Sequence, residues 1–221
     1  MATAWPASDE GPPVQRVVLE ADCDGGVLGS RYQFGVDPGT VSMVAACRRA
    51  AGAPDPAEHG RRIADDVYVV PGPEVSERAL SVWRTGAPDV AARLADDQRI
   101  WVVDGGRIGP ESVLQPIVAS SRLVIVVSGS SVEDLVRVPA RVAQFKSLGV
   151  SITVGVLVVG KPAQNMDELR SFFGSDSVWV GPAPDDMRSI TAACIAGGRA
   201  RRSVVWRAAT DLGSELAGVG R

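Results

Sequence analysis

The chain of 221 residues is 45% hydrophobic and 22% charged, an ordinary globular composition that excludes a disordered or fibrous protein. Its net charge of −3 provides no overall basic field, so we expect neither nucleic acid nor an anionic membrane as a direct partner. Three cysteines, one histidine and the lack of a long apolar run argue against a zinc site, a disulfide framework and a transmembrane span, and they indicate a cytoplasmic protein.

Six short apolar runs follow one another along the chain and predict β-strands. Four of them are continuously apolar, which is typical of parallel strands that are covered on both faces. The runs are residues 16–20, 67–70, 100–103, 123–127, 152–159 and 178–180.

The segments between these runs predict helices. The clearest is residues 130–148, where Ser130 and Glu133 have the pattern of a capping box and Pro139 is expected to kink the helix. The other predicted helices are residues 75–94, 110–118, 165–173, 187–196 and 203–219. The alternation of strands and helices indicates an α/β fold with an open, mostly parallel sheet.

A single domain is expected over residues 15–219, preceded by a flexible remnant over residues 1–14. The segment 51–60, rich in Pro and Gly, predicts a loop that is too short to separate two domains. His59 in that segment is expected to be a loop histidine without a catalytic role. The final helix, residues 203–219, lacks the cationic face of an interfacial helix, so we expect it to dock on the domain and not on a membrane.

Carboxylates stand at the ends of two predicted strands, where open parallel sheets bind their ligands. Glu20, Asp22 and Asp24 alternate off the end of the first strand into a pair of glycines. Residues 100–106, IWVVDGG, end an apolar strand in Asp104 and have the form of a Walker B strand, whose aspartate holds Mg²⁺. The alternative is that Asp104 only ends a strand, because Asp-Gly is also common turn chemistry.

One segment approaches the pattern of a phosphate-binding loop, since residues 155–161, GVLVVGK, satisfy GxxxxGK. Its four intervening residues are apolar and belong inside a strand, and Pro162 stands where a hydroxyl would reach the metal. The chain has only two lysines, Lys146 and Lys161, so we expect no phosphate-binding loop within these residues. No G-x-G-x-x-G fingerprint follows any predicted strand, which argues against a Rossmann-type enzyme.

The order of these motifs resembles that of the ParA/MinD ATPases, the deviant-Walker branch of P-loop proteins. Residues 17–32 resemble the family's second strand and its aspartate-rich motif, and residues 100–108 resemble its Walker B segment. Residues 122–141 are similar to the strand and helix that follow. Residues 152–161 resemble the strand that ends near the base, and residues 181–186 resemble the loop along the adenine.

The resemblance implies a nucleotide-dependent switch in partitioning, positioning or secretion that binds Mg-ATP at a homodimer interface and contacts protein partners. It places Asp104 near the metal and makes Asp22 the catalytic aspartate that helps to position the attacking water. The residues that it implies in cofactor binding are Glu20, Asp24, Lys161 and Pro184.

The family's first strand and its phosphate-binding loop have no counterpart among the residues that carry the resemblance. That strand is central in the family's sheet, so its omission is expected to leave two strand edges where strands should pair. Either the recorded start is an internal methionine of a longer protein, because residues 2–5 resemble the interior of a helix, or the chain is a pseudo-ATPase scaffold that binds protein partners. In both cases we expect it not to bind ATP tightly.

Overall fold

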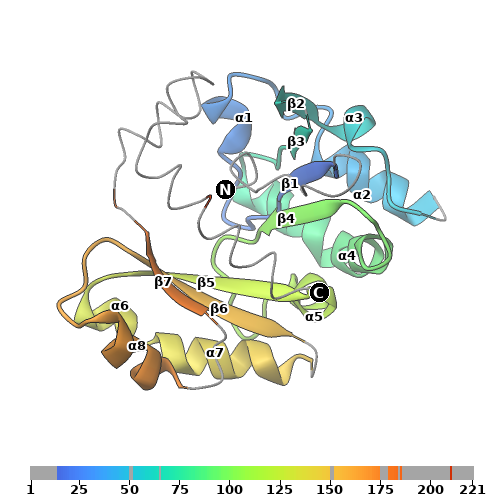
Figure 1. Ribbon diagram of the computed structural model, residues 1–221. Coiled ribbons are helices and arrows are strands. Elements are labelled where there is room, and N and C mark those ends of the chain that lie inside the picture. The colour runs from blue at the N-terminus through green and yellow to red at the C-terminus, as the bar shows by residue number, and fades with distance from the viewer. Residues whose placement is uncertain are drawn as a thin grey trace. The chain divides into compact units, whose positions relative to one another are not determined.

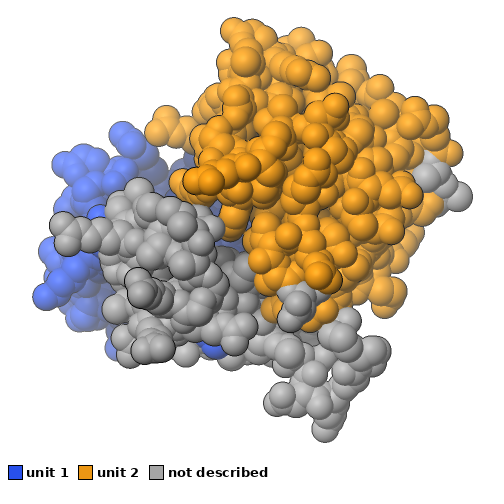
Figure 2. All heavy atoms as spheres, turned by 90° about the horizontal axis from the view of Figure 1, so that it is seen from above, with its two compact units in different colours: residues 1, 3–6, 121–221 blue, residues 2, 7–120 orange. Residues whose placement is uncertain are grey.

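The computed structural model describes residues 14–49, 52–64, 66–149, 152–174, 179–183, 185 and 210, and it divides into two compact units. The described residues up to Ser120 form the N-terminal unit and those from Ser121 onward form the C-terminal unit, coloured orange and blue in Figure 2. The single domain expected over residues 15–219 stays a prediction.

The N-terminal unit is built on a four-stranded sheet, in which the pairing of β1 with β4 positions the acids. Strands β1 (Arg16–Glu20), β3 (Val67–Val70) and β4 (Ile100–Asp104) are parallel, while β2 (Arg61–Ala64) is antiparallel to β3. The strand order is β2-β3-β1-β4, as can be followed in Figure 1. Strand β1 therefore lies between two parallel neighbours.

Central strand β1 turns one face into the hydrophobic core of this unit, while Val18 on the other face is half-buried. Val17 and Leu19 have no exposed surface and belong to the main hydrophobic cluster of this unit. Helices α2 (Thr40–Arg49) and α4 (Ser76–Leu94) pack against one another and supply Met43 and Trp83 to the same cluster. The short helices of the unit are α1 (Leu28–Arg31), α3 (Pro56–His59) and α5 (Gln115–Ser120).

Strand β2 forms one edge of this sheet and was not expected from the sequence. Its residues, RRIA, are mostly exposed, so they lack the apolar run by which the other strands were recognised. The pairing with β3 is also irregular between Arg62 and Ala64. Exposed charges and an irregular register are features that protect a sheet edge from pairing with another strand.

Strand β4 forms the other edge of the sheet and has the opposite character. Among the described residues it pairs with β1 along one side only. Its four apolar residues, Ile100 to Val103, are half-buried although their composition predicts burial on both faces. The start of the strand is held by Asp97, which accepts a hydrogen bond from the Trp101 indole N–H at 2.7 Å and pairs with Arg99.

The C-terminal unit is built on a three-stranded parallel sheet with β6 (Thr153–Val159) in the centre. Strands β5 (Leu123–Gly129) and β7 (Trp179–Ala183) pair with it on either side. Figure 1 shows helices α6 (Val132–Leu135), α7 (Val138–Ser147) and α8 (Met166–Phe173) along one face of this sheet. Five consecutive residues of β6 are buried, whereas every described residue of β5 is at least partly exposed.

The single kinked helix expected over residues 130–148 is two helices, α6 and α7. Pro139 lies in the first turn of α7, where its missing N–H and fixed φ suit the start of a helix. The N-cap of α6 is Ser131 and not Ser130, and its hydroxyl accepts a hydrogen bond from the Asp134 N–H at 3.2 Å. Proline therefore begins a new helix here, and the expected kink is wrong.

The fold class predicted from the sequence is confirmed, because both units combine mostly parallel strands with flanking helices. All six expected strands are present, and α4 and α8 match the expected helices closely. The helix expected over residues 110–118 begins later, at Gln115. Residues 187–196, residues 203–219 apart from Thr210, and residues 1–13 lie outside the described residues. No helix in the described part of the chain is long and apolar enough to cross a membrane.

Candidate functional site

Two of the predicted acidic strand ends meet at one edge of the N-terminal sheet. In the register of β1 and β4, Glu20 is the partner of Asp104. The N–H of Ala21, the next residue, donates to the backbone carbonyl of Asp104 at 2.7 Å. Because parallel strands end together, the loop after β1 and the loop after β4 begin side by side. The sheet thus brings the predicted aspartate-rich and Walker B segments to the same place.

Glu20 is used inside the protein. The residue is only 2% exposed. Its Oε1 accepts hydrogen bonds from the Val27 N–H at 2.6 Å and the Leu28 N–H at 2.9 Å. Its Oε2 accepts from the Gly72 N–H at 2.8 Å. Three charge-assisted bonds satisfy this carboxylate and fasten the turn after β1 to the loop after β3. The cofactor-binding role predicted for Glu20 stays a prediction, and its structural role is plain.

Asp22 and Asp104 converge on the backbone of Gly106. Asp104 accepts a hydrogen bond from the Gly106 N–H at 3.2 Å through Oδ1. Gly106 has a φ of 57°, and a Cβ at this position would lie 2.2 Å from the carboxyl carbon of Asp22. Only glycine combines the left-handed conformation with this close approach. Both predicted functional aspartates therefore lie against Gly106, which sequence reasoning did not foresee.

The surroundings of these two aspartates leave their outer surfaces to solvent. Asp104 and Asp24 are exposed and Asp22 is half-buried. Asp22 Oδ1 accepts a hydrogen bond from the Asp24 N–H at 2.8 Å, which forms a tight Asx turn. The thiol of Cys23, between the two acids, has a pKa raised by burial and by the negative charges of Asp22 and Asp24. A raised pKa keeps more of the thiol protonated at neutral pH, so Cys23 is less reactive than an ordinary cysteine and is not an activated catalytic nucleophile.

The acid cluster has no preformed cage for a cation. Within the described residues, no group of three or more His, Cys, Asp or Glu side chains is arranged to hold a metal ion. Mg²⁺ commonly keeps several waters and uses only one or two carboxylates together with substrate phosphates. The carboxylates of Asp104 and Asp22, which both lie against Gly106, would supply these one or two protein ligands. Metal binding by Asp104 stays a prediction.

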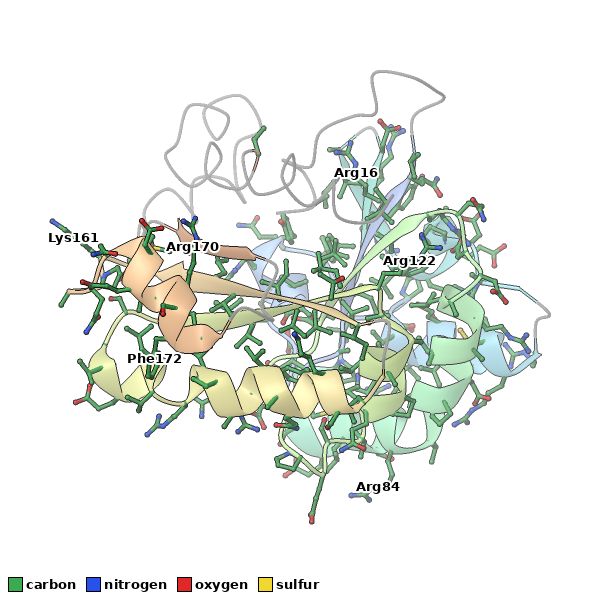
Figure 3. All side chains as sticks on the ribbon, turned by 60° about the horizontal axis from the view of Figure 1, so that its bottom comes forward. Arg16, Arg84, Arg122, Lys161, Arg170 and Phe172 are labelled. Atoms are coloured by element: carbon green, nitrogen blue, oxygen red, sulfur yellow. The ribbon has the colours of Figure 1, made fainter. Side chains whose placement is uncertain are left out.

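Three loops meet at the carboxyl ends of the strands in the C-terminal unit, next to the predicted residue Lys161. The Gly160 N–H donates to the Ala183 carbonyl at 2.8 Å, and a Cβ on Gly160 would lie 2.8 Å from the Ser130 hydroxyl. The serine-rich turn after β5 and the loops after β6 and β7 therefore meet. Lys161 is exposed, and Figure 3 shows it projecting outward from the unit. Pro184 lies outside the described residues.

His59 differs from its expected surroundings. It is the last residue of helix α3, only 8% exposed, and its Nδ1 lies 3.0 Å from the Ser42 hydroxyl. The pKa of His59 is lowered, chiefly because burial disfavours the charged imidazolium. The expected loop histidine is therefore a buried group that ties α3 to α2. Nothing in the sequence marked this, because the contact joins residues 17 positions apart.

Comparison with solved structures places the chain among known folds. It is similar to a ParA family ATPase from Chlorobium tepidum TLS, with 14% identity, a TM-score of 0.75, and coverage of 97% of this chain and 89% of that one. It is similar to the septum site-determining protein MinD from Pyrococcus horikoshii OT3, solved with Mg-ADP, at 14% identity and a TM-score of 0.70 over 94% of this chain and 86% of that one. This chain has a ParA/MinD-like ATPase fold.

The ParA/MinD-like fold also extends to a biosynthetic enzyme. Cobyrinic acid a,c-diamide synthase from Mycobacterium smegmatis, solved with a bound ATP analog and magnesium, matches with 12% identity and a TM-score of 0.62, over 92% of this chain and 82% of that one. No protein-family model matches the sequence, and no curated protein matches it either. The likeness shown by these comparisons therefore lies in the fold alone.

Proposed function

We propose that the chain is the ATPase module of a nucleotide-dependent switch that acts in partitioning, positioning or secretion. The observation that carries this proposal is the meeting of Asp22 and Asp104 at Gly106, at the carboxyl ends of two parallel strands of a ParA/MinD-like fold. In such sheets ligands bind beyond the carboxyl ends of the strands. Asp104 then holds Mg²⁺ and Asp22 helps to position the attacking water.

Further roles follow from the same proposal. Asp24 lies next to Asp22 on the exposed side of the turn, where it faces the cofactor. The loops at Lys161 and Pro184 contact the base. Mg-ATP lies at the interface of a homodimer that contacts protein partners in the cytoplasm. Light scattering of a nucleotide-binding form, with and without Mg-ATP, tests the homodimer, because the proposal requires the mass to double on binding.

We propose in addition that the phosphate-binding loop is supplied by polypeptide outside residues 1–221. Two observations support this. The sequence offers no GxxxxGK[ST] loop. Within the described residues, strand β4 is an apolar, half-buried edge strand, and it lacks the arginines that guard β2. Edge strands of this kind expose backbone groups that another strand can pair with. Strand β4 ends in Asp104 and is the Walker B strand of the proposed module, so an added strand would pair directly beside the proposed metal ligand.

The test is to join the first strand and phosphate-binding loop of a solved relative to the N-terminus of this chain, in frame with β1. The proposal predicts Mg²⁺-dependent ATP hydrolysis by the extended chain. Asp104→Ala should lower that hydrolysis by about two orders of magnitude, as expected for loss of a group that holds the metal. Cys23→Ser should leave it nearly unchanged, because the protonated thiol has no role in the mechanism.

One observation favours the alternative of a non-catalytic pseudo-ATPase scaffold. Glu20, at the start of the aspartate-rich segment, is committed to three backbone N–H groups and is 2% exposed. An acid that has become structural suits a sheet kept as a scaffold for protein partners. The extended chain separates the two proposals, since a scaffold would remain without hydrolysis whether or not Asp104 is present, even when circular dichroism shows that it is folded.

A further inference from the structure

A cavity of about 450 Å³ opens on the N-terminal unit next to the acidic turn. The loop after β1 contributes one side chain to it, α4 contributes another, and the segment after β4 contributes the rest. The side chains that define it are Cys23, Leu80, Arg107, Pro110, Glu111 and Val113. All of them belong to the same compact unit.

The walls of this cavity are largely apolar and are connected to the core. Leu80 and Val113 are half-buried, and Cys23 and Val113 also pack against the main hydrophobic cluster. Side chains anchored in this way hold their positions when solvent is displaced. The cavity is apolar and open to solvent, so it is suited to cover one side of a single apolar group and not to enclose a whole ligand.

The rim of the cavity carries one charge of each sign. Arg107 and Glu111 are exposed, and neither has a hydrogen bond or an ion pair with another described residue. The guanidinium donors of Arg107 and the carboxylate oxygens of Glu111 therefore remain available. A rim with both charges discriminates against ligands of a single sign and favours a ligand that carries both.

We propose that this cavity receives a short segment of a protein partner, with one apolar side chain between Leu80 and Val113. An acidic group of that segment pairs with Arg107 and a basic group pairs with Glu111. This interaction needs no nucleotide and goes beyond the proposed ATPase function. Because Cys23 lies between Asp22 and Asp24, the bound segment contacts the turn that carries both aspartates.

The position of Cys23 allows the cavity to be probed directly by disulfide exchange. In the full chain carrying Cys194→Ser, two thiols remain, and Cys47 has no exposed surface and a pKa raised to about 11, chiefly by burial. The probes are disulfides of cysteamine. Two are uncharged and carry a methyl or an isobutyl group, and three carry the isobutyl group together with a carboxylate, an ammonium, or both charges. Intact mass spectrometry over a series of reductant concentrations gives, for each probe, the reductant concentration at which half of the protein stays labelled. A higher value means that the probe is bound more strongly.

The proposal predicts a specific order of these concentrations. The isobutyl probe should withstand about tenfold more reductant than the methyl probe, since it buries apolar surface. Each charge should add no more than about two- to fivefold, as expected for an exposed ion pair. Arg107→Gln should remove the increment of the carboxylate and Glu111→Gln that of the ammonium. Arg122→Gln, labelled in Figure 3, and Glu133→Gln in the C-terminal unit are the matched controls and should change neither.

Two results would overturn the proposal. Equal labelling by the methyl and isobutyl probes would show that the cavity does not receive an apolar group, and charge increments that survive Arg107→Gln and Glu111→Gln would show that its rim does not read charge. Capped Asp-Leu-Lys or Lys-Leu-Asp peptides should compete with the doubly charged probe. Competition by free leucine but by neither peptide would assign the cavity to a small amino acid and contradict the partner segment.

Discussion

Glu20 and Asp104 are register partners at the ends of neighbouring strands, yet the protein uses them in opposite ways. Glu20 is 2% exposed and its two oxygens accept three backbone N–H groups from two loops. Asp104 is exposed and accepts one N–H, from a residue two positions away in its own turn. The same functional group at the same height of the sheet is a structural anchor in one strand and available to a ligand in the other.

The difference arises from which backbone groups surround each carboxylate. Loops that turn back over the end of β1 direct N–H groups at Glu20, and a buried carboxylate is stable only when it is satisfied in this way. After β4 the chain turns away through two glycines, so Asp104 keeps water on its outer side. Burial and backbone donors therefore separate this structural acid from the acid that stays open to solvent.

Removal of the Glu20 carboxylate tests the structural half of this comparison and should have the largest effect. Glu20→Ala should lower the free energy of unfolding by about 3 kcal/mol, because it strips an acceptor from three N–H groups, one of them on a buried glycine. Urea denaturation followed by circular dichroism measures the loss. Asp24→Ala, an exposed acid in the same turn, should cost less than about 0.5 kcal/mol. Equal losses for the two variants would contradict the structural role of Glu20.

The contact at Gly106 tests whether the two aspartates are coupled. Gly106→Ala should destabilise the protein by about 2 kcal/mol, because alanine is strained at a φ of 57° and its Cβ meets the Asp22 carboxylate. In an Asp22→Ala background the cost should fall by about 1 kcal/mol, since the steric part of it is gone. A double-mutant cycle of unfolding free energies gives this coupling. Strictly additive losses would show that Gly106 does not hold Asp22.

His59 sharpens the comparison by adding a buried group that stability requires to be neutral. Its pKa is lowered by burial, with Arg49 acting in the same direction and Glu58 and Asp55 opposing it. His59 therefore binds a proton more readily in the unfolded chain than in the folded one. Its contribution to the free energy of unfolding is present above its ordinary pKa and is lost as the pH falls below that value. Unfolding free energies of the wild type and of His59→Gln should diverge most near neutral pH and converge in acid. Parallel curves would remove His59 as the cause.

Asp104→Asn should have the smallest effect on stability. Asparagine retains an oxygen that can accept from the Gly106 N–H, and the position is exposed, so the change should stay below about 0.5 kcal/mol. The melting temperature of the variant checks this. A large destabilisation would mean that Asp104, like Glu20, serves the fold and not a ligand.

Periodicity and apolar runs were sufficient to predict most of the strands, because four of the six runs are continuously apolar, which is typical of strands in a parallel sheet. They missed β2, whose arginines belong to an exposed edge, and they joined α6 to α7 across Pro139. The strand-end acids were found by position, but Glu20, Asp22 and Asp24 looked equivalent in sequence. Their separation depends on Val27, Leu28 and Gly72, whose N–H groups approach Glu20 only after the chain has folded.

The availability of Asp104 to a ligand, and the source of the phosphate-binding loop, can be tested together by calorimetric titration with Mg-ATP. The account predicts no micromolar binding by residues 1–221, because Asp22 and Asp104 alone present negative charge to a negative ligand. It predicts micromolar binding by the chain extended with a strand and phosphate-binding loop, weakened about tenfold or more by Asp104→Ala. Micromolar binding by residues 1–221 themselves would contradict the account, since it would reveal a phosphate site elsewhere in this chain.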